Sequence, residues 1–553
     1  MRRLRLVVYL MMTVPFFVLL ARAFVLQIVQ YKSHREYIES LKVHVRRIEA
    51  PRGRIMTRDG VVLAWDEEIL VAKSIGPIDV ERVEEVLGQE RKLKLLLGEE
   101  IPVTEAEAVK LEKTGVLIFR KYVRRYGKLA PHVLGYLNAD RQGVTGIEKQ
   151  YDNYLRGIDG YELVSISASG KVIGRFLQAL PIPGNDLVLT IDSQVQEYTQ
   201  KLLSSSSHAG TIIVQSAEDG SILAMASSPS FDPNVLLSVE KRQWLEISND
   251  PKSPLLNRAI SATYTPGSII KPLYAIAYLE NQPNLDRTVD CKGYYEYIGS
   301  SGRVLGVYRD WYVAGHGITD LKKAIKVSCN VFFYTLALEL GIEKMKQFSN
   351  LFMLDSLTGI DLPGERKGLY PDPSWKQSVY KEQWYPGDTI LCGIGQGFVN
   401  LTPIEVINFF NTLANDGVSY RPHLLSKVIN QQGKQVFEYE KTISNKVTLK
   451  QSTIRYLKDA LREVVMSNGN PADEGTAYQA FKGFGIPVAG KTGTAETGRS
   501  GERPHSWFAG FSPVDTPQII VLVMLENAGG GGETAAPVAR KILDFCLKGM
   551  QER

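Results

Sequence analysis

Residues 264–279 read YTPGSIIKPLYAIAYL, and the predicted fold is built outward from this segment. It opens with a turn signal, and the apolar run Leu273–Leu279 predicts a helix directly after the turn. Pro272 is compatible with this helix because the first helical turn has N–H groups without intrahelical partners. Ser268 is therefore expected at the N-terminus of a helix, with Lys271 one turn later on the same face.

Two further short motifs follow in the chain, Ser328-Cys329-Asn330 and Lys491-Thr492-Gly493-Thr494. Such motifs are weak singly, and second copies occur at Ser238-Val239-Glu240-Lys241 and Lys113-Thr114-Gly115. Context separates the copies, because Lys113 lies in a charged segment upstream of either serine. The Lys491 motif lies in a strand pattern whose glycines let a ligand approach the backbone.

These residue types fit nucleophilic acyl transfer. A serine hydroxyl is a poor nucleophile until a neighbouring base takes its proton, and Lys271 fits that role if burial and nearby positive charge depress its pKa. Ser328 and Asn330 are expected to relay the proton and hold a substrate amide; the alternative is that they cap a helix. The alternative for Lys271 is a solvated lysine in a first helical turn.

The strand motif completes this predicted site. Lys491, Thr492, Gly493 and Thr494 are expected to bind a substrate, and the lysine and threonines suit a carboxylate. The backbone N–H groups of Ser268 and Thr494 are expected to form an oxyanion hole, in which one donor contributes roughly a hundred- to thousand-fold in rate.

The N-terminus predicts a membrane anchor. Three arginines within the first five residues precede a largely apolar segment, Leu6–Val29, which is long enough to span a bilayer as a helix. The basic end is expected to stay cytoplasmic, which places the rest of the chain outside the cytoplasmic membrane as a single-pass protein. A cleaved signal peptide ending near Ala21-Arg22-Ala23 is the alternative, although the apolar segment continues past it.

The remaining 520 or so residues are too many to fold around a single hydrophobic core. The whole chain length suggests roughly three or four domains. We expect the anchor in residues 1–30, a non-catalytic module in 31–185 with a small head insert at about 68–128, and a catalytic domain in 186–553. The net charge of +5 is not gathered in a block and no nucleic-acid motif occurs, so nucleic acid is not an expected partner. Four cysteines are too few for a disulfide scaffold.

The catalytic domain is expected to be α+β, with an antiparallel sheet flanked by helices. A hairpin is predicted near its start, a helix-rich middle follows, and strands return near the end of the chain. The predicted strands are Thr211–Ser216, Ser221–Ala226, Ile486–Ala495, Ser506–Phe511 and Ile519–Glu526, and the predicted closing helix is Ala536–Leu547. In the head insert, helices are predicted at Val80–Leu97 and Glu105–Lys113.

The three motifs in this order resemble those of β-lactamases and penicillin-binding proteins. The chain resembles the class B penicillin-binding proteins over nearly its whole length. The additional matching stretches are Arg22–Gln27, Arg52–Ile55, Arg58-Asp59-Gly60, Gly146-Ile147-Glu148, Asn257-Arg258-Ala259, Gly395-Gln396-Gly397 and Thr402-Pro403. Stretches that look more like penicillin-binding protein 2, the elongation type, are Tyr308–Trp311, Gly315-His316-Gly317, Phe332-Phe333-Tyr334 and Trp384–Thr389.

The resemblance implies a D,D-transpeptidase that crosslinks the stem peptides of lipid-linked nascent peptidoglycan and is inhibited by β-lactam antibiotics. It also implies a SEDS-type glycosyltransferase partner in the membrane and further proteins of an elongation complex. A septal transpeptidase of the same class is the first alternative. A serine β-lactamase is disfavoured because no Glu-x-x-x-Asn lies between Asn330 and Lys491. A non-catalytic β-lactam sensor would need several membrane spans.

The resemblance also implies a structural zinc ion, since some elongation-type members bind zinc beside the active site. Asp310, His316 and Cys329 stand where such ligands are expected, and Cys291 is the best fourth candidate at a position that matches less well. The alternatives are a buried cysteine with a structural histidine, or a Cys291–Cys329 disulfide. The acyl transfer itself requires no cofactor.

Overall fold

The computed structural model describes residues 2–32, 35, 42–74, 76–112, 114–166, 172–237, 241–281 and 284–551. These form two compact units, and the chain passes between them several times. Unit 1 comprises residues 1–53, 66–124 and 156–184, and unit 2 comprises residues 54–65, 125–155 and 185–553. The last crossing lies between residues 184 and 185, and residues 54–65 and 125–155 belong to unit 2.

Unit 1 begins with the helix α1 (Arg2–Phe24) and the short π-helical turn η1 (Val25–Val29). In the part of the chain that the structure describes, no helix combines the length and apolar character needed to cross a bilayer. The unit contains an antiparallel sheet in the order β1 (Lys42–Ile48), β6 (Gly160–Ile166) and β7 (Val172–Ala179).

The head insert has its own small core. β3 (Val62–Ser74) runs from unit 2 into unit 1, where its later residues pair with β4 (Ile101–Val103). The predicted helices are present as α3 (Val80–Leu96), which a kink at Gly88 (φ 78°) divides into two helical segments, and α4 (Glu105–Leu111); β5 (Val116–Tyr126) follows them. α4 begins with a capping box between Thr104 and Glu107, which explains where the helix starts.

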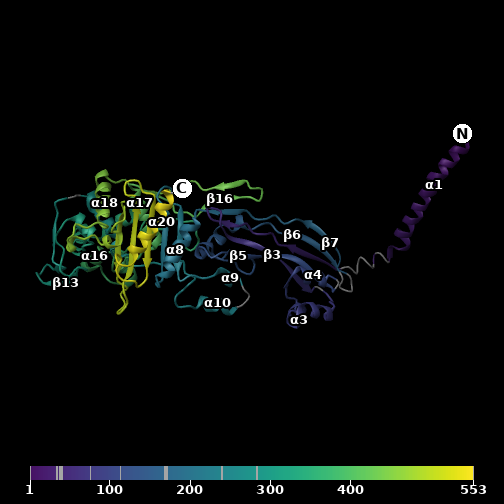
Figure 1. The fold of residues 1–553 in the computed structure, drawn as a ribbon, viewed down its shortest axis with the longest axis horizontal. Coiled ribbons are helices and arrows are strands. Elements are labelled where there is room, and N and C mark those ends of the chain that lie inside the picture. Colours follow the sequence, from purple (N-terminus) through teal and green to yellow (C-terminus); the bar gives the residue numbers. More distant parts are fainter. Residues whose placement is uncertain are drawn as a thin grey trace. The chain divides into compact units, whose positions relative to one another are not determined.

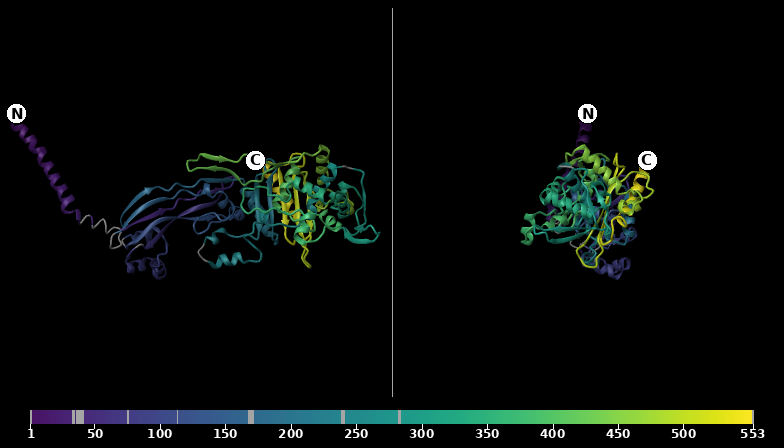
Figure 2. Two further views of the ribbon diagram at one scale, coloured as in Figure 1. Left: turned by 180° about the vertical axis from the view of Figure 1, so that it is seen from behind. Right: turned by 90° about the vertical axis from the view of Figure 1, so that its left-hand side faces the viewer.

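The centre of unit 2 is an antiparallel sheet that joins distant parts of the sequence (Figures 1 and 2). Its order is β10 (Ile222–Ser228), β9 (Gly210–Ser216), β21 (Ile519–Leu525), β20 (His505–Ser512) and β19 (Ala489–Ala495). The five predicted strands are therefore confirmed. β19 begins three residues later than predicted, at the second residue after Pro487, whose nitrogen cannot donate a hydrogen bond to a neighbouring strand.

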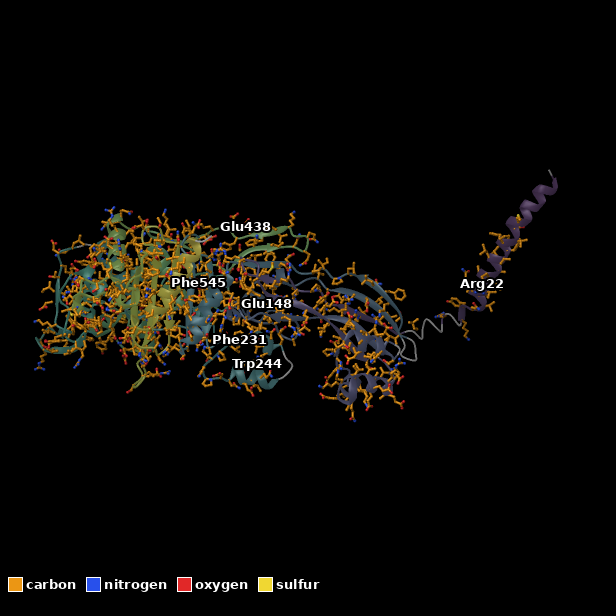
Figure 3. The ribbon with its side chains drawn as sticks, viewed as in Figure 1. Arg22, Glu148, Phe231, Trp244, Glu438 and Phe545 are labelled. Atoms are coloured by element: carbon orange, nitrogen blue, oxygen red, sulfur yellow. The ribbon has the colours of Figure 1, made fainter. Side chains whose placement is uncertain are left out.

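Helices cover both faces of this sheet, as the complete burial of β21 requires. α8 (Ser193–Ser205) packs against β10, and α20 (Ala535–Gln551) packs against β20 and β21. Phe545 of α20, labelled in Figure 3, stacks on Tyr198 of α8 with 4.5 Å between ring centroids. α17 (Pro403–Ala414) contacts β9, β20 and β21, and it starts with the predicted capping box of Thr402 and Glu405.

The middle of unit 2 carries the predicted helix-rich segment. Its elements around the motifs are α11 (Arg258–Ser261), the 3₁₀ turn η2 (Gly267–Ile270), α12 (Lys271–Asn281), β11 (Val289–Cys291), β12 (Tyr294–Ile298), β13 (Val304–Arg309), β14 (Gly317–Thr319), α13 (Leu321–Lys326), α14 (Asn330–Leu351), α16 (Pro386–Cys392), α18 (Gln451–Glu463) and α19 (Tyr478–Phe481).

Smaller elements complete unit 2. They are β2 (Ile55–Met56), α5 (Pro131–Leu134), α6 (Gly146–Gln150), α7 (Asp152–Leu155), β8 (Asp186–Leu189), α9 (Pro233–Leu236), α10 (Lys241–Ser248), α15 (Pro373–Tyr380), β15 (Val418–Tyr420), β16 (Leu425–Ile429), β17 (Gln435–Glu438), β18 (Ile443–Lys446) and the turn η3 (Pro471–Asp473).

Candidate active site

The turn that carries Ser268 is held on two sides by backbone contacts. Tyr264 exchanges two backbone hydrogen bonds of 2.9 Å with Leu401, and the Gly267 N–H donates to the Gly395 carbonyl at 2.9 Å. Gly267 has a φ of 58°, and a Cβ there would lie 2.6 Å from the Thr494 carbonyl oxygen. Glycine at position 267 therefore allows β19 to lie directly against the turn that bears Ser268.

Ser268 lies in the 3₁₀ turn η2, and Lys271 begins α12 directly after it. Residues three apart are eclipsed in a 3₁₀ turn, so the two side chains share a face. The structure thus confirms that Ser268 lies at the entrance to a helix, with a tighter first turn than the sequence predicts.

Lys271 is completely buried. Its ammonium donates to the Ser328 carbonyl at 2.8 Å, to the Asn330 Oδ1 at 2.7 Å and to the Ser328 hydroxyl at 3.3 Å. It also lies 5.2 Å from the centre of the Phe333 ring. Burial lowers the pKa of Lys271 to about 8, against the opposing attraction of the Asp310 carboxylate. The alternative of a solvated first-turn lysine is wrong.

Lys491, in the middle of β19, is also fully buried. Its ammonium donates to the Ser328 hydroxyl at 2.9 Å and to the Thr492 carbonyl at 3.0 Å. Burial, and then the charge of Lys271, lower the pKa of Lys491 well below its usual range. Ser328 thus bridges two lysines, and its φ of 56° places it in the left-handed region that non-glycine residues rarely adopt.

The motif residues open onto one cavity of about 850 Å³. Ser268, Ser328, Asn330, Thr492 and Thr494 all line it. Lys271 and Lys491 lie behind this lining. β19 is the edge strand of the sheet, so its free edge faces the Ser268 turn and can offer backbone groups to a bound peptide. The remaining lining residues are Arg309, Asp310, Trp311, Tyr334, Ile394, Gln396, Thr476, Gln479, Ala480, Glu496, Gly530, Gly531, Gly532, Glu533, Pro537 and Arg540.

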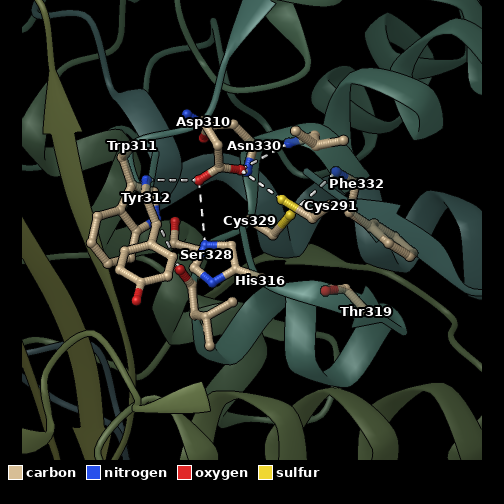
Figure 4. A network of polar contacts seen from close by, with 12 residues as sticks. Cys291, Asp310, Trp311, Tyr312, His316, Thr319, Ser328, Cys329, Asn330 and Phe332 are labelled. Carbon is tan, nitrogen blue, oxygen red and sulfur yellow. Dashed lines mark hydrogen bonds and ion pairs between the residues drawn. The ribbon is translucent and has the colours of Figure 1, made fainter. Parts of the chain in front are cut away.

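A second polar cluster lies beside Ser328 (Figure 4). One ligand atom from each of Cys291, Asp310 and Cys329 lies within 4.8 Å of the others, and all three residues are buried. The His316 Nε2 lies 3.3 Å from the Asp310 Oδ1, and the Cys291 thiol lies 3.7 Å from the Asp310 Oδ2. Both cysteines are free thiols, so the alternative of a Cys291–Cys329 disulfide is wrong.

Asp310 has a further role that sequence reasoning missed. Its Oδ2 accepts the backbone N–H groups of Asn330 at 2.6 Å and Val331 at 3.1 Å, at the start of α14. The carboxylate therefore caps that helix and fixes the Ser328-Cys329-Asn330 segment. No local sequence signal reveals this contact, because Asp310 precedes Asn330 by 20 residues.

The second copies of the motifs behave differently. The described residues do not include Lys113 of the second Lys-Thr-Gly copy. They also do not include Ser238, Val239 and Glu240 of the second Ser-x-x-Lys copy. Thr114 is buried in unit 1 and donates to the Leu111 carbonyl at 2.7 Å, which is a structural role at the end of α4. The Ser268 motif and the Lys491 motif both contribute residues to the lining of the cavity.

A serine at a helix entrance, a buried lysine of lowered pKa, a bridging hydroxyl and a strand with a free edge together define an enzyme of the serine acyltransferase class. Comparison with known proteins narrows this class. Residues 210–544 match the model of the penicillin binding protein transpeptidase domain, and residues 70–189 match the penicillin-binding protein dimerisation domain.

Relatives extend over nearly the whole chain. The peptidoglycan D,D-transpeptidase MrdA of Escherichia coli is 31% identical over 96% of this chain and 92% of its own length. Stage V sporulation protein D of Bacillus subtilis is 30% identical over 90% of this chain and 78% of its own. Penicillin-binding protein 2 of Helicobacter pylori, solved in complex with MreC, superposes with a TM-score of 0.76 at 27% identity and covers 92% of this chain and 99% of its own. The chain belongs to the penicillin-binding protein family.

Proposed function

We propose that this protein is a peptidoglycan D,D-transpeptidase and that its acyl-enzyme forms on Ser268. The Ser268 oxygen attacks the carbonyl of the penultimate D-Ala of a stem peptide, the bond to the terminal D-Ala breaks, and that D-Ala leaves with a proton. The amine of a neighbouring stem then attacks the ester, forms the crosslink and restores the hydroxyl. The observation that carries the proposal is the completely buried Lys271, whose pKa of about 8 suits a base next to Ser268.

The other motif residues have complementary roles in this proposal. Ser328 accepts hydrogen bonds from both lysines and therefore suits proton relay, and Asn330 suits the substrate amide. Thr492 and Thr494, which line the cavity, bind the carboxylate of the terminal D-Ala, and Lys491 and Gly493 of the same strand support them from behind the lining. The N–H groups of Ser268 and Thr494 supply the oxyanion hole, since β19 lies directly against the Ser268 turn.

The cellular role follows from the relatives. We place the protein in lateral wall elongation, as the names of its MrdA and penicillin-binding protein 2 relatives suggest. A related chain belongs to a peptidoglycan synthase complex that couples polymerization to crosslinking, at 28% identity and a TM-score of 0.73. This supports a SEDS-type glycosyltransferase and other elongation proteins as partners, and septal duty is the alternative. Penicillin-binding protein 2 of Pseudomonas aeruginosa, 28% identical, was solved in complex with WCK 5153.

The membrane anchor and the domain boundaries remain part of the proposal. We propose residues 1–30 as a cytoplasmic tip and transmembrane anchor, 31–185 as the non-catalytic module and 186–553 as the transpeptidase domain outside the cytoplasmic membrane. The basic residues that precede the apolar part of α1 support this orientation.

We also propose that Cys291, Asp310, His316 and Cys329 bind a structural zinc ion. The donor set suits zinc, for which neighbouring ligands of a tetrahedral site lie about 3 to 4 Å apart. His316 lies 3.3 Å from the Oδ1 of Asp310, and Cys291 lies 3.7 Å from the Oδ2 of Asp310. The ligand atoms of Cys291, Asp310 and Cys329 lie within 4.8 Å of one another, which is slightly wider than this value. The buried His316 Nε2 lies against the Asp310 carboxylate, which places the two groups where they can share one ion. Such an ion would hold Cys329, and with it Ser328 and Asn330, in place.

The function is tested with full-length protein, a stem pentapeptide and an excess of acceptor amine. The wild type should release D-Ala in step with crosslinked product, and Ser268→Ala should release none above background. Ser238→Ala, in the second Ser-x-x-Lys copy, is the matched control and should retain turnover. Turnover by Ser268→Ala, or its loss in Ser238→Ala alone, would contradict the assignment.

A further inference from the structure

Thr476 is a cavity residue that the three motifs do not include. It lies just before α19 and lines the same cavity as Ser268. Its hydroxyl oxygen lies 2.7 Å from the hydroxyl oxygen of Thr492 in β19, so the two groups share one hydrogen bond in which either can donate. Among the described residues this is the one hydrogen bond of the Thr476 side chain, and Thr492 is therefore the acceptor that the protein offers to its proton.

The backbone holds Thr476 firmly against β19 from three other segments. Its N–H donates to the carbonyl of Lys326, the last residue of α13, at 3.2 Å. The N–H of the next residue, Ala477, donates to the Val464 carbonyl at the end of α18 at 2.9 Å. A Cβ at Gly532 would lie 2.1 Å from the Thr476 carbonyl oxygen, so the loop before α20 packs directly on this residue. The hydroxyl of Thr476 is thus fixed in place before any ligand binds.

The other threonine of β19 that lines the cavity shows which way its hydroxyl is oriented. The Gly531 N–H donates to the Thr494 hydroxyl oxygen at 3.2 Å. A backbone N–H can only donate, so the Thr494 oxygen is the acceptor in this bond and its single proton remains for a further acceptor. Thr492 would present its own proton in the same way if its oxygen accepted from Thr476.

The direction of the bond between Thr476 and Thr492 decides what the strand offers to an anion. An ionised carboxylate only accepts hydrogen bonds, and a hydroxyl has a single proton to donate. If Thr492 donated that proton to Thr476, it would present only lone pairs to the carboxylate, which repel it. If Thr476 donates instead, the Thr492 proton is free for a charge-assisted hydrogen bond to the carboxylate.

We propose that Thr476 is a positioning residue that donates its hydroxyl proton to Thr492 and so directs the Thr492 proton to the carboxylate of the ligand. Thr476 acts through Thr492 and needs no contact of its own with the ligand. Two hydroxyl groups in series also polarise each other, which strengthens the bond to the anion. This inference rests on the proposed function, in which Thr492 and Thr494 bind the carboxylate of the terminal D-Ala.

The test compares benzylpenicillin, which has a free carboxylate, with its methyl ester, which has none. The second-order rate constant for acylation of full-length protein is measured for both, and their ratio is the readout, because a change in Ser268 reactivity alone alters both constants equally. Thr476→Val removes the hydroxyl at nearly constant shape and should lower the ratio about 10-fold, as should Thr476→Ala. Thr476→Ser retains a hydroxyl and should keep the ratio close to the wild-type value.

Ser467 supplies the matched control, since its hydroxyl donates to Glu474 at 3.2 Å and the residue lies outside the lining of the cavity. Ser467→Ala should keep both rate constants. The inference is overturned if Thr476→Val slows both compounds by the same factor, because Thr476 would then only support the fold. It is also overturned if Thr476→Val leaves the ratio unchanged, or if Thr476→Ser lowers it as much as Thr476→Val does. A wild-type protein that benzylpenicillin does not acylate would instead refute the proposed function, a result that needs no variant.

Discussion

The amino group of Lys491 donates a 2.9 Å hydrogen bond to the hydroxyl of Ser328. The same hydroxyl lies 3.3 Å from the amino group of Lys271, so one oxygen connects two fully buried lysines. Two ammonium groups this close repel each other, and burial penalises the charge of each. The arrangement therefore favours a neutral lysine, which is the state required of the base proposed for Ser268.

The rate of Ser268 acylation should rise with pH. Below its pKa of about 8, Lys271 is mostly protonated and cannot accept the serine proton, so the neutral fraction grows until the pH exceeds that value. The second-order rate constant for a labelled penicillin should be about 100-fold lower at pH 6 than on the plateau above pH 8. Stopped-flow measurement across this range checks the prediction, and a rate independent of pH would contradict it.

Removal of the bridging hydroxyl should slow acylation without unfolding the protein. Ser328→Ala should lower the acylation rate constant by about 100-fold or more, because the proton relay between Lys271 and Lys491 loses its central oxygen. Ser328→Gly is the matched variant, since glycine relieves the left-handed backbone at φ 56° but also lacks the hydroxyl. Recovery of the rate in the glycine variant would show that backbone strain, rather than the hydroxyl, explains the defect.

Gly267→Ala should impair both stability and acylation. The new Cβ would meet the Thr494 carbonyl at 2.6 Å and force β19 away from the Ser268 turn. Gly501→Ala is the control, because Gly501 also has a positive φ, at 85°, but has open space around it. The control should lose only about 1 kcal/mol of unfolding free energy and retain acylation. Equal acylation rates in the two variants would contradict the close approach of the strand.

Protein purified without added zinc should contain about one zinc ion per chain by elemental analysis. His316→Ala should lose most of this zinc and unfold at a lower temperature, since a bound metal stabilises the folded state. His208→Ala, at a partly buried histidine of the same unit outside the cluster, serves as the control. Equal zinc content in wild type and His316→Ala would refute the proposed metal site.

Local signals predicted much of unit 2 correctly. The turn before Ser268, the hairpin of β9 and β10, the strand of Lys491 and the capping box at Thr402 each depend on neighbouring residues, and the structure confirms them. The start of β19 differs from the prediction. Pro487 has no N–H group to donate to a neighbouring strand, and the strand begins after it, at Ala489.

Contacts between distant residues were beyond sequence reasoning. The capping of α14 by Asp310 and the placement of Arg540 in the cavity depend on how loops and helices pack, and neither leaves a periodic pattern. The assignment of residues 54–65 and 125–155 to unit 2 also depends on long-range packing. The left-handed backbone of Ser328 is imposed by its surroundings, since its residue type does not favour that conformation.

Acylation of Ser268 is tested by mass spectrometry of the protein after incubation with a penicillin. We predict a single stable penicilloyl adduct on the peptide that contains Ser268, absent from Ser268→Ala. A folded protein that forms no adduct, or forms it on another residue, would contradict the account.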